Sequence, residues 1–278
     1  MLCADDTVLL YSAKSQSDIK KYLSEDLVSL TNWFAANKLH LNIKKCKWTL
    51  FGSQRRLQQT SKPEIKINNE EVEHVDSYKY LGVQLDKTLN FEDHIESLCK
   101  KLRQRLGVLR RVRDYVDQDT ALKLYNALVM PLIDYCDVTY TSSTSTCILK
   151  VDRLMMKGGR IVLNVPYDTP TIVVLDRLKW LTFKERILYH KQLQMYKCRF
   201  GMSPNYLSSL FEKVDHGYDT RLSDTDLKLP RCFTNMGQKA FSYCGASLWN
   251  TLSNELKASS SLDIFKSKLL QDILLSRQ

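Results

Sequence analysis

Hydrophobic residues in the first third of the chain follow first a helical and then a strand-like spacing. Residues 18–36 carry large apolar side chains at steps of three or four, which predicts a helix with Asp18 as its N-cap. Short strand-type segments follow: one ends at Phe51–Gly52, two flank Asn68–Asn69, and another covers Tyr78–Val83. Asn-Asn between such segments is typical of a hairpin turn. Residues 1–91 are therefore predicted to be β-rich with one long helix.

From residue 92 onward the spacing is helical. Leucines and other aliphatic residues recur at steps of three or four over residues 95–112, and a second helix reaches residue 136 after a break near Asp114–Asp117. Further helices are predicted at Leu149–Leu163, Thr182–Phe200 and Leu262–Leu275, with an aromatic segment at Phe241–Trp249. A Ser/Thr-rich junction at 141–146 indicates a boundary, and a polar loop is expected near 213–230.

Composition indicates a globular protein. Hydrophobic residues make up 44% of the 278 residues, with 14 Tyr and 4 Trp, which argues against disorder. We find no apolar stretch long enough for a membrane span and no secretory leader, so we expect an intracellular protein, nuclear or cytoplasmic, with no membrane partner. The eight cysteines are scattered without metal-site spacing, and we expect them to be reduced.

The positive charge of the chain is unevenly distributed. Residues 1–95 hold equal numbers of basic and acidic side chains, so the net charge of +10 arises from residues 96–278. Seven basic residues without an acid lie on the predicted helix at 100–113: Lys100, Lys101, Arg103, Arg105, Arg110, Arg111 and Arg113. The leucine stripe occupies the core side of this helix, so we predict a cationic surface that binds nucleic-acid phosphates. The alternative is an ordinary solvated helix face.

Two adjacent carboxylates, Asp5 and Asp6, precede the strand-type run Thr7–Tyr11. A strand next to a tight turn would hold such a pair rigidly, as two-metal nucleotidyl transfer requires. Oxygen ligands of this kind suit Mg²⁺. Taken alone, the pair is also compatible with a solvated turn.

The order of several motifs carries a family resemblance. After Ala4-Asp5-Asp6 and the predicted helix come Asn37-Lys38-Leu39-His40-Leu41-Asn42, Lys45-Cys46-Lys47, Phe51-Gly52 and Tyr78-Lys79-Tyr80-Leu81-Gly82. This set, within residues 2–94, resembles the reverse transcriptases of non-LTR (LINE-type) retrotransposons. Residues 124–135, 240–252 and 262–266 resemble downstream segments of the same family.

The resemblance implies an α+β fold with three parts. Residues 1–91 would be the C-terminal half of a polymerase palm, built of antiparallel hairpins plus a helix and carrying the primer grip. Residues 92–140 would be the thumb helices, and residues 147–278 a mainly helical C-terminal region. The implied activity is RNA-directed DNA polymerisation, with Mg²⁺ (or Mn²⁺), an RNA template, a DNA primer and deoxynucleoside triphosphates in the complete enzyme.

The resemblance also implies individual roles. Asp5 would be a catalytic metal ligand and Asp6 its auxiliary neighbour, while Lys45 would lie near the phosphates of the incoming nucleotide and donate a proton to pyrophosphate. Tyr80, Leu81 and Gly82 would form the primer grip. The alternatives are a solvated loop lysine for Lys45 and an ordinary strand and turn for residues 80–82.

Two departures from the family pattern weaken the enzymatic interpretation. Cys3 replaces the aromatic residue usual before Ala4. The aspartate-bearing strand and the fingers that precede this region in the family are not in the sequence, and one turn cannot supply a whole two-metal site. We therefore expect a fragment, from a truncated copy or gene model, that is inactive alone. Its alternatives are a non-catalytic nucleic-acid-binding remnant and a relic without function.

Overall fold

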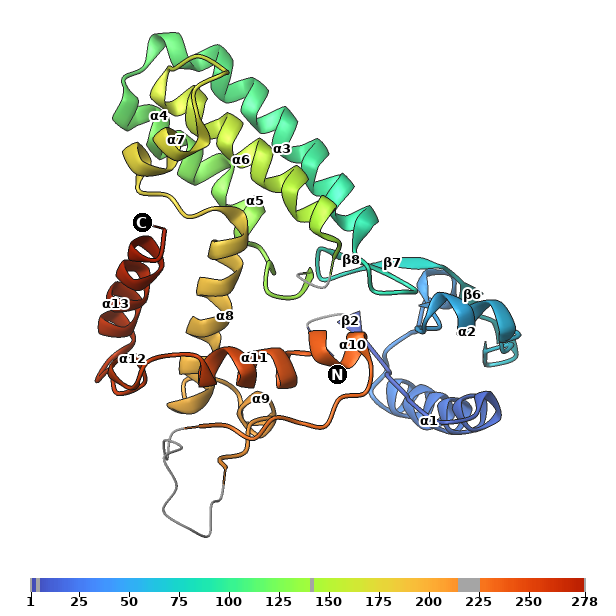
Figure 1. Cartoon of the computed structure of the whole chain (residues 1–278). Helices are drawn as coiled ribbons and strands as arrows, with labels where there is room; N and C mark the ends of the chain where they lie inside the picture. The colour runs from blue at the N-terminus through green and yellow to red at the C-terminus, as the bar shows by residue number, and fades with distance from the viewer. Residues whose placement is uncertain (1, 4–5, 141–142, 215–225, 278) are drawn as a thin grey trace. The chain divides into compact units, whose positions relative to one another are not determined.

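The computed structural model describes residues 2–3, 6–140, 143–214 and 226–277 (Figure 1). The chain divides into two compact units, Met1–Leu89 and Asn90–Gln278. Short strands and helices make up the first unit, and helices dominate the second. The expectation of an α+β chain is confirmed at this level.

Four two-stranded ladders form the β-structure of the first unit. Three are antiparallel: β1 (Leu2–Cys3) with β2 (Asp6–Thr7), β4 (Lys66–Ile67) with β5 (Glu70–Glu71), and β7 (Ser77–Tyr80) with β8 (Val83–Asp86). The fourth is parallel and joins β3 (Lys47–Trp48) to β6 (Glu73–His74). All four are short, so few backbone hydrogen bonds hold this part of the chain together.

Two-residue turns with positive φ close two of the antiparallel ladders. Asn68 and Asn69 have φ of 50° and 66°, as the predicted hairpin requires. Leu81 and Gly82, with φ of 43° and 85°, connect Tyr80 to its ladder partner Val83. The prediction of one continuous strand over Tyr78–Val83 is therefore wrong, because the chain reverses direction at Leu81–Gly82. Leucine rarely adopts positive φ, which makes this turn a strained one.

The long helix of the first unit, α1 (Gln16–Ala36), has no buried residue. Its N-cap is Ser15, whose hydroxyl accepts a hydrogen bond from the Asp18 backbone N–H at 3.1 Å, so the prediction of Asp18 as the cap is wrong by one turn. The core cluster beneath it is small and consists of Ile65, Ile67 and Val72, with partly buried neighbours that include Leu23, Leu27 and Trp48. A 3₁₀ turn at Ile43–Lys45 and a helix α2 (Gln54–Gln59) complete the unit.

The described part of the second unit is built mainly of helices. They are α3 (Glu92–Val112), a 3₁₀ turn η2 (Arg113–Tyr115), α4 (Gln118–Leu128), α5 (Met130–Asp134), α6 (Ser145–Leu163), α7 (Thr171–Leu178), α8 (Phe183–Arg199), α9 (Asn205–Ser208), α10 (Asn235–Lys239), α11 (Phe241–Asn250), α12 (Asn254–Lys257) and α13 (Leu262–Leu275). The predicted break between α3 and α4 and the bounds of α13 are confirmed. The predicted second helix is interrupted at Val129, just before Pro131 at the start of α5.

Close approach between helices defines the first core of this unit. A Cβ atom on Gly158 of α6 would lie 2.3 Å from the Tyr125 ring of α4 and 2.9 Å from Leu106 of α3, so only glycine fits. The Tyr125 ring stacks on Trp180 at 4.6 Å between centroids. These contacts bring α3, α4, α6 and the segment before α8 together, and α3 and α6 lie side by side in Figure 1.

Stacked aromatic rings define a second core among α8, α11 and α13. The Phe265 ring lies 4.6 Å from Tyr196 and 6.4 Å from Trp249, and all three side chains are almost fully buried. The Tyr196 hydroxyl donates to the Ser259 carbonyl at 2.8 Å. Trp249 therefore contributes to the core and is not free to stack on a nucleic-acid base.

Two further expectations concerned membrane spans and the state of the cysteines. Among the helices of the described residues, none combines the length and apolar character needed to cross a membrane. Seven cysteines, from Cys46 to Cys244, are free thiols.

Candidate nucleic-acid interface

The aspartate pair predicted to bind metal lies next to the first ladder. Asp6 is the first residue of β2, pairs with Cys3 of β1, and is exposed. Asp5 lies outside the described residues. The structure thus places a strand on each side of residues 4–5, and it shows one carboxylate, Asp6, at the start of the second strand.

The other residues to which the resemblance assigns a polymerase role lie on surface turns of the first unit. Lys45 ends the 3₁₀ turn at Ile43–Lys45 and its side chain is exposed. Tyr80 ends β7 and is half-buried, whereas the following Leu81 is 42% exposed. Leu81 and Gly82, the two turn residues with positive φ, are both exposed. These positions therefore offer an exposed lysine and an accessible backbone turn.

The basic helix predicted from the sequence is α3. Its buried residues are Ile95, Leu98, Cys99, Leu102, Leu106 and Leu109. They form one stripe, because positions three, four and seven apart lie on the same side of a helix. Six of the seven predicted basic residues, Lys100, Lys101, Arg103, Arg105, Arg110 and Arg111, are exposed. Their charges are available to a ligand in solvent.

The exposed basic residues of α3 are not evenly spread around the helix. At about 100° per residue, Arg110, Arg103, Lys100 and Arg111 fall within an arc of roughly 100°, which we call the basic ridge. Lys101 and Arg105 lie on the other flank of the buried stripe. Within the described residues, no carboxylate forms an ion pair with a ridge side chain. The ridge is therefore a row of positive side chains without an ion-pair partner among the described residues.

Arg113 differs from the other six predicted residues. Its Nε donates to the carbonyls of Ile161 and Val162 at 3.1 Å each, and its Nη1 donates to the Val116 carbonyl at 2.7 Å. These bonds reach carbonyls in the last turn of α6, where the regular i+4 backbone donors of a helix run out, and the Ile161 carbonyl also accepts from the Asn164 N–H at 3.1 Å. The helical phase of Arg113 matches that of the leucine stripe, so the sequence pattern itself indicates a position on the core side. Its guanidinium joins α3 to α6.

The charge order along α3 also favours the helix itself. Glu92 and Asp93 occupy its first turn and Arg110 and Arg111 its last. Acidic side chains near the N-terminus and basic ones near the C-terminus both interact favourably with the helix dipole. Glu96 additionally lies 3.8 Å from Lys150 of α6. The basic end of α3 thus needs no counter-charge to be stable.

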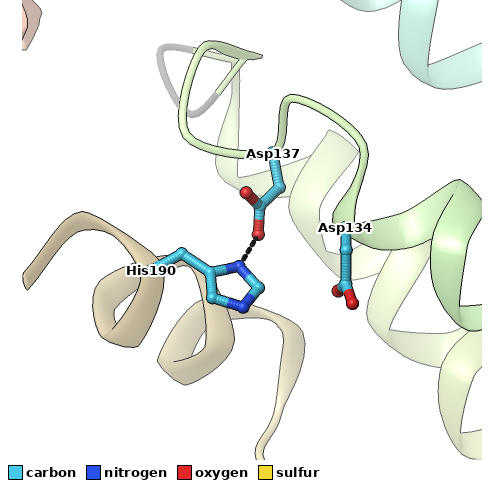
Figure 2. A group of neighbouring side chains, drawn as sticks. All are labelled: Asp134, Asp137 and His190. Atoms are coloured by element: carbon cyan, nitrogen blue, oxygen red, sulfur yellow. Dashed lines mark hydrogen bonds and ion pairs between the residues drawn. The ribbon is translucent and has the colours of Figure 1, made fainter. Parts of the chain in front are cut away.

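A polar cluster that the sequence analysis did not predict lies between α5 and α8. Figure 2 shows His190 of α8 pointing toward Asp137, with Asp134 at the end of α5 beside them. The His190 Nδ1 lies 2.5 Å from Asp137 Oδ2. Arg186, one turn before His190, donates from Nη2 to Asp134 Oδ2 at 2.6 Å and from Nε to Asp134 Oδ1.

This cluster has some features of a metal site, since Asp134, Asp137 and His190 offer ligand atoms within 4.8 Å of one another. However, both oxygens of Asp134 accept from Arg186, and the guanidinium would stand next to any bound cation. Arg186 with Asp134 and His190 with Asp137 make two paired groups that need no further ligand. We interpret the cluster as a structural link between α5 and α8.

Comparisons with known proteins find sequence similarity to polymerases of mobile elements. All the relatives found are RNA-directed DNA polymerases of non-LTR retrotransposons, so the resemblance inferred from the motifs is confirmed. No family model and no solved structure matches the chain.

Three of these relatives illustrate the similarity. The chain is 27% identical over 208 residues, or 74% of its length, to the RNA-directed DNA polymerase from mobile element jockey of Drosophila funebris. It is 21% identical over 210 residues to the probable RNA-directed DNA polymerase from transposon X-element of Drosophila melanogaster, and 25% identical over 190 residues to that from transposon BS. The matches cover 73% and 67% of this chain. The chain spans 22%, 23% and 21% of the respective relatives.

Proposed function

We propose that this chain is a fragment of a non-LTR retrotransposon reverse transcriptase and that its own activity is binding of nucleic acid through the basic ridge of α3. In this proposal, residues 1–91 derive from the palm, 92–140 from the thumb and 147–278 from the C-terminal region. The observation that carries the binding function is the row of exposed basic side chains at Lys100, Arg103, Arg110 and Arg111, which form no ion pair among the described residues.

The ridge suits a nucleic-acid backbone for a physical reason. Lys and Arg contacts to phosphates release condensed counterions, which makes binding strong at low salt and largely independent of base sequence. A rigid 21-residue helix holds these charges in a fixed row. An RNA–DNA hybrid, the product of reverse transcription, is the ligand that we propose for this surface. The basic residues on the opposite flank would add to long-range attraction.

Binding can be measured by fluorescence anisotropy with a blunt RNA–DNA hybrid over a series of salt concentrations. We expect reversal of Arg103, Arg110 and Arg111 to Glu to weaken binding strongly and to reduce the salt slope by about three units, since each lost phosphate contact removes about one. Arg113 is left unchanged because it joins α3 to α6. The control reverses Lys184, Arg231 and Lys268, three exposed basic residues of the same unit. Equal losses in the two variants would contradict a specific role for the ridge.

In the parent enzyme we propose that Asp5 and Asp6 bind Mg²⁺ or Mn²⁺, that Lys45 contacts the incoming deoxynucleoside triphosphate, and that Tyr80, Leu81 and Gly82 position the primer. Two-metal nucleotidyl transfer needs carboxylates that grip both ions from different sides. The chain matches only about a fifth of the length of its relatives. We therefore expect no primer extension by this chain alone.

A primer-extension assay tests this directly. The purified chain is supplied with an RNA template, a DNA primer, deoxynucleoside triphosphates and either Mg²⁺ or Mn²⁺. We expect no extended product. Extension by the wild-type chain that disappears in Asp5→Ala and Asp6→Ala would overturn the proposal of an inactive fragment and restore the enzymatic interpretation.

A further inference from the structure

Two tyrosines of the second unit are exposed to an unusual degree. Tyr115, the last residue of η2, is 87% exposed, and Tyr167, between α6 and α7, is 80% exposed. Large aromatic side chains generally gain stability from burial, and an exposed tyrosine offers an apolar ring face together with a polar hydroxyl to a ligand. The core tyrosines Tyr125, Tyr140 and Tyr196 of the same unit are almost completely buried.

Each exposed tyrosine belongs to a segment in which an arginine side chain donates hydrogen bonds to backbone carbonyls. Arg113 fixes the segment of Tyr115 by donating to the carbonyls of Ile161 and Val162. Arg160 donates from Nε to the Thr169 carbonyl at 2.9 Å, and its guanidinium lies 5.9 Å from the centroid of the Tyr167 ring. The cation–π contact supports Tyr167 from within the protein. Both rings therefore extend from backbone segments that are hydrogen-bonded to the rest of the unit.

The same contacts bring the two tyrosines to one end of the unit. The acceptors of Arg113 lie in the last turn of α6, and the segment that carries Tyr167 begins just after that turn. In Figure 1 the segment after α6 lies beside the end of α3. We call this end, with Tyr115 and Tyr167, the aromatic tip. The ridge residues Arg110 and Arg111 lie about one turn of helix before Tyr115.

Charges at the aromatic tip indicate which part of a nucleic acid could lie there. Asp114 and Asp168 flank the two tyrosines and would repel phosphates. Asp117 caps α4 by accepting from the Thr120 N–H at 2.8 Å, and Asp119 pairs with Lys123 at 2.6 Å. The tip therefore suits a neutral base more than a phosphate, while the neighbouring ridge suits the phosphates.

We propose that the aromatic tip is a stacking site for unpaired bases of a nucleic-acid strand whose phosphates lie along the basic ridge. Stacking on aromatic rings tolerates any base, because every base has a π face. The ligand class is single-stranded RNA or DNA, or a single-stranded extension of a duplex. This inference rests on the proposed function of the ridge. The ridge would bind the phosphates of the strand, and the aromatic tip would bind its bases.

Substitution of the two tyrosines tests the proposal. Anisotropy is measured with a single-stranded oligonucleotide and with the blunt RNA–DNA hybrid, for wild type, the double variant Tyr115→Ala/Tyr167→Ala and the matched control Tyr115→Phe/Tyr167→Phe. Phenylalanine keeps the ring and alanine removes it. We expect the alanine variant to bind the single strand at least about fivefold more weakly, and the phenylalanine variant to stay within about twofold of wild type. Binding of the hybrid should change little in either variant.

The outcomes separate this inference from the proposed function. If the ridge reversal weakens hybrid binding but the alanine variant binds the single strand as wild type does, the aromatic tip is not a stacking site. Equal weakening of both probes by the alanine variant would also overturn it. If the wild-type chain binds neither probe, both proposals fail. If the alanine variant instead turns a dimeric chain into a monomer in light scattering, the tip is a protein interface.

Discussion

Helices α1 and α3 have the same length, 21 residues, yet α1 buries no residue and α3 buries six. The difference extends to their surroundings. The core cluster near α1 contains three buried residues, whereas α3 packs along α6 and against α4. Since isolated helices are only marginally stable in water, packing decides how firmly each helix is held. The residues that we propose to be polymerase motifs therefore lie in the weakly packed unit, and the basic ridge lies in the well-packed one.

The largest effect should come from removing an aromatic ring in the second unit. Phe265 is fully buried against Tyr196 and Trp249, and we expect Phe265→Ala to lower the free energy of unfolding of this unit by about 3–5 kcal/mol. The matched control is Phe233→Ala, because Phe233 is 94% exposed. Thermal denaturation followed by circular dichroism measures both. A control that destabilises as much as Phe265→Ala would break the comparison.

A smaller effect is expected from the ionic link between Glu185 in the first turn of α8 and Arg277, which follows α13. Glu185 accepts from Arg277 and from the Thr182 backbone and hydroxyl, and Arg277 also donates to the Trp180 carbonyl at 2.9 Å. Burial raises the pKa of Glu185, but the bonds from Arg277 and Thr182 outweigh it and hold that pKa below its usual value. Glu185→Gln should therefore cost about 1.5–3 kcal/mol at neutral pH.

The pH dependence of that effect follows from the sign of the shift. A carboxyl group with a lowered pKa in the folded state stabilises the protein above its unfolded-state pKa, and this contribution is lost as the pH falls through the folded-state value. Urea titrations at neutral and acidic pH should show the gap between wild type and Glu185→Gln closing in acid. A gap that stays constant across the acidic range would show that Glu185 does not act through its charge.

The smallest effects should come from the helix caps, which allow a like-for-like test of the two units. The Ser15 hydroxyl caps α1 and the Thr182 hydroxyl caps α8 within a capping box. Each change to Ala should cost about 1 kcal/mol in the helix that it caps. Because α8 belongs to a packed core, we expect Thr182→Ala to lower the main unfolding transition and Ser15→Ala to leave it unchanged. A shift of that transition by Ser15→Ala would mean that the two units unfold together.

The sequence predicted the long helices well and the short or non-local elements poorly. The bounds of α13 and the break between α3 and α4 followed from spacing, which is a local property. The helices α7 and α9 were not predicted, since short helices carry too few positions to show a period. The parallel pairing of β3 with β6 was missed because Lys47 and Glu73 are far apart in the sequence.

In the candidate site, too, local features were predicted from the sequence and non-local contacts were not. Helical phase was enough to predict the exposed basic residues of α3, and the same phase would have placed Arg113 on the core side. The link of Arg186 and His190 to Asp134 and Asp137 joins residues about fifty positions apart, and only packing of α8 near α5 brings them together. The two exposed tyrosines carried no signal of their own, because exposure depends on the packed structure.

Amide hydrogen exchange across the intact chain tests the central comparison most directly, because it reports the local stability of each helix. The account predicts fast exchange over residues 1–91, including the middle of α1, and slow exchange in the middle of α3, α6 and α8. Equally slow exchange in α1 and α3, in a chain that light scattering shows to be monomeric, would contradict it.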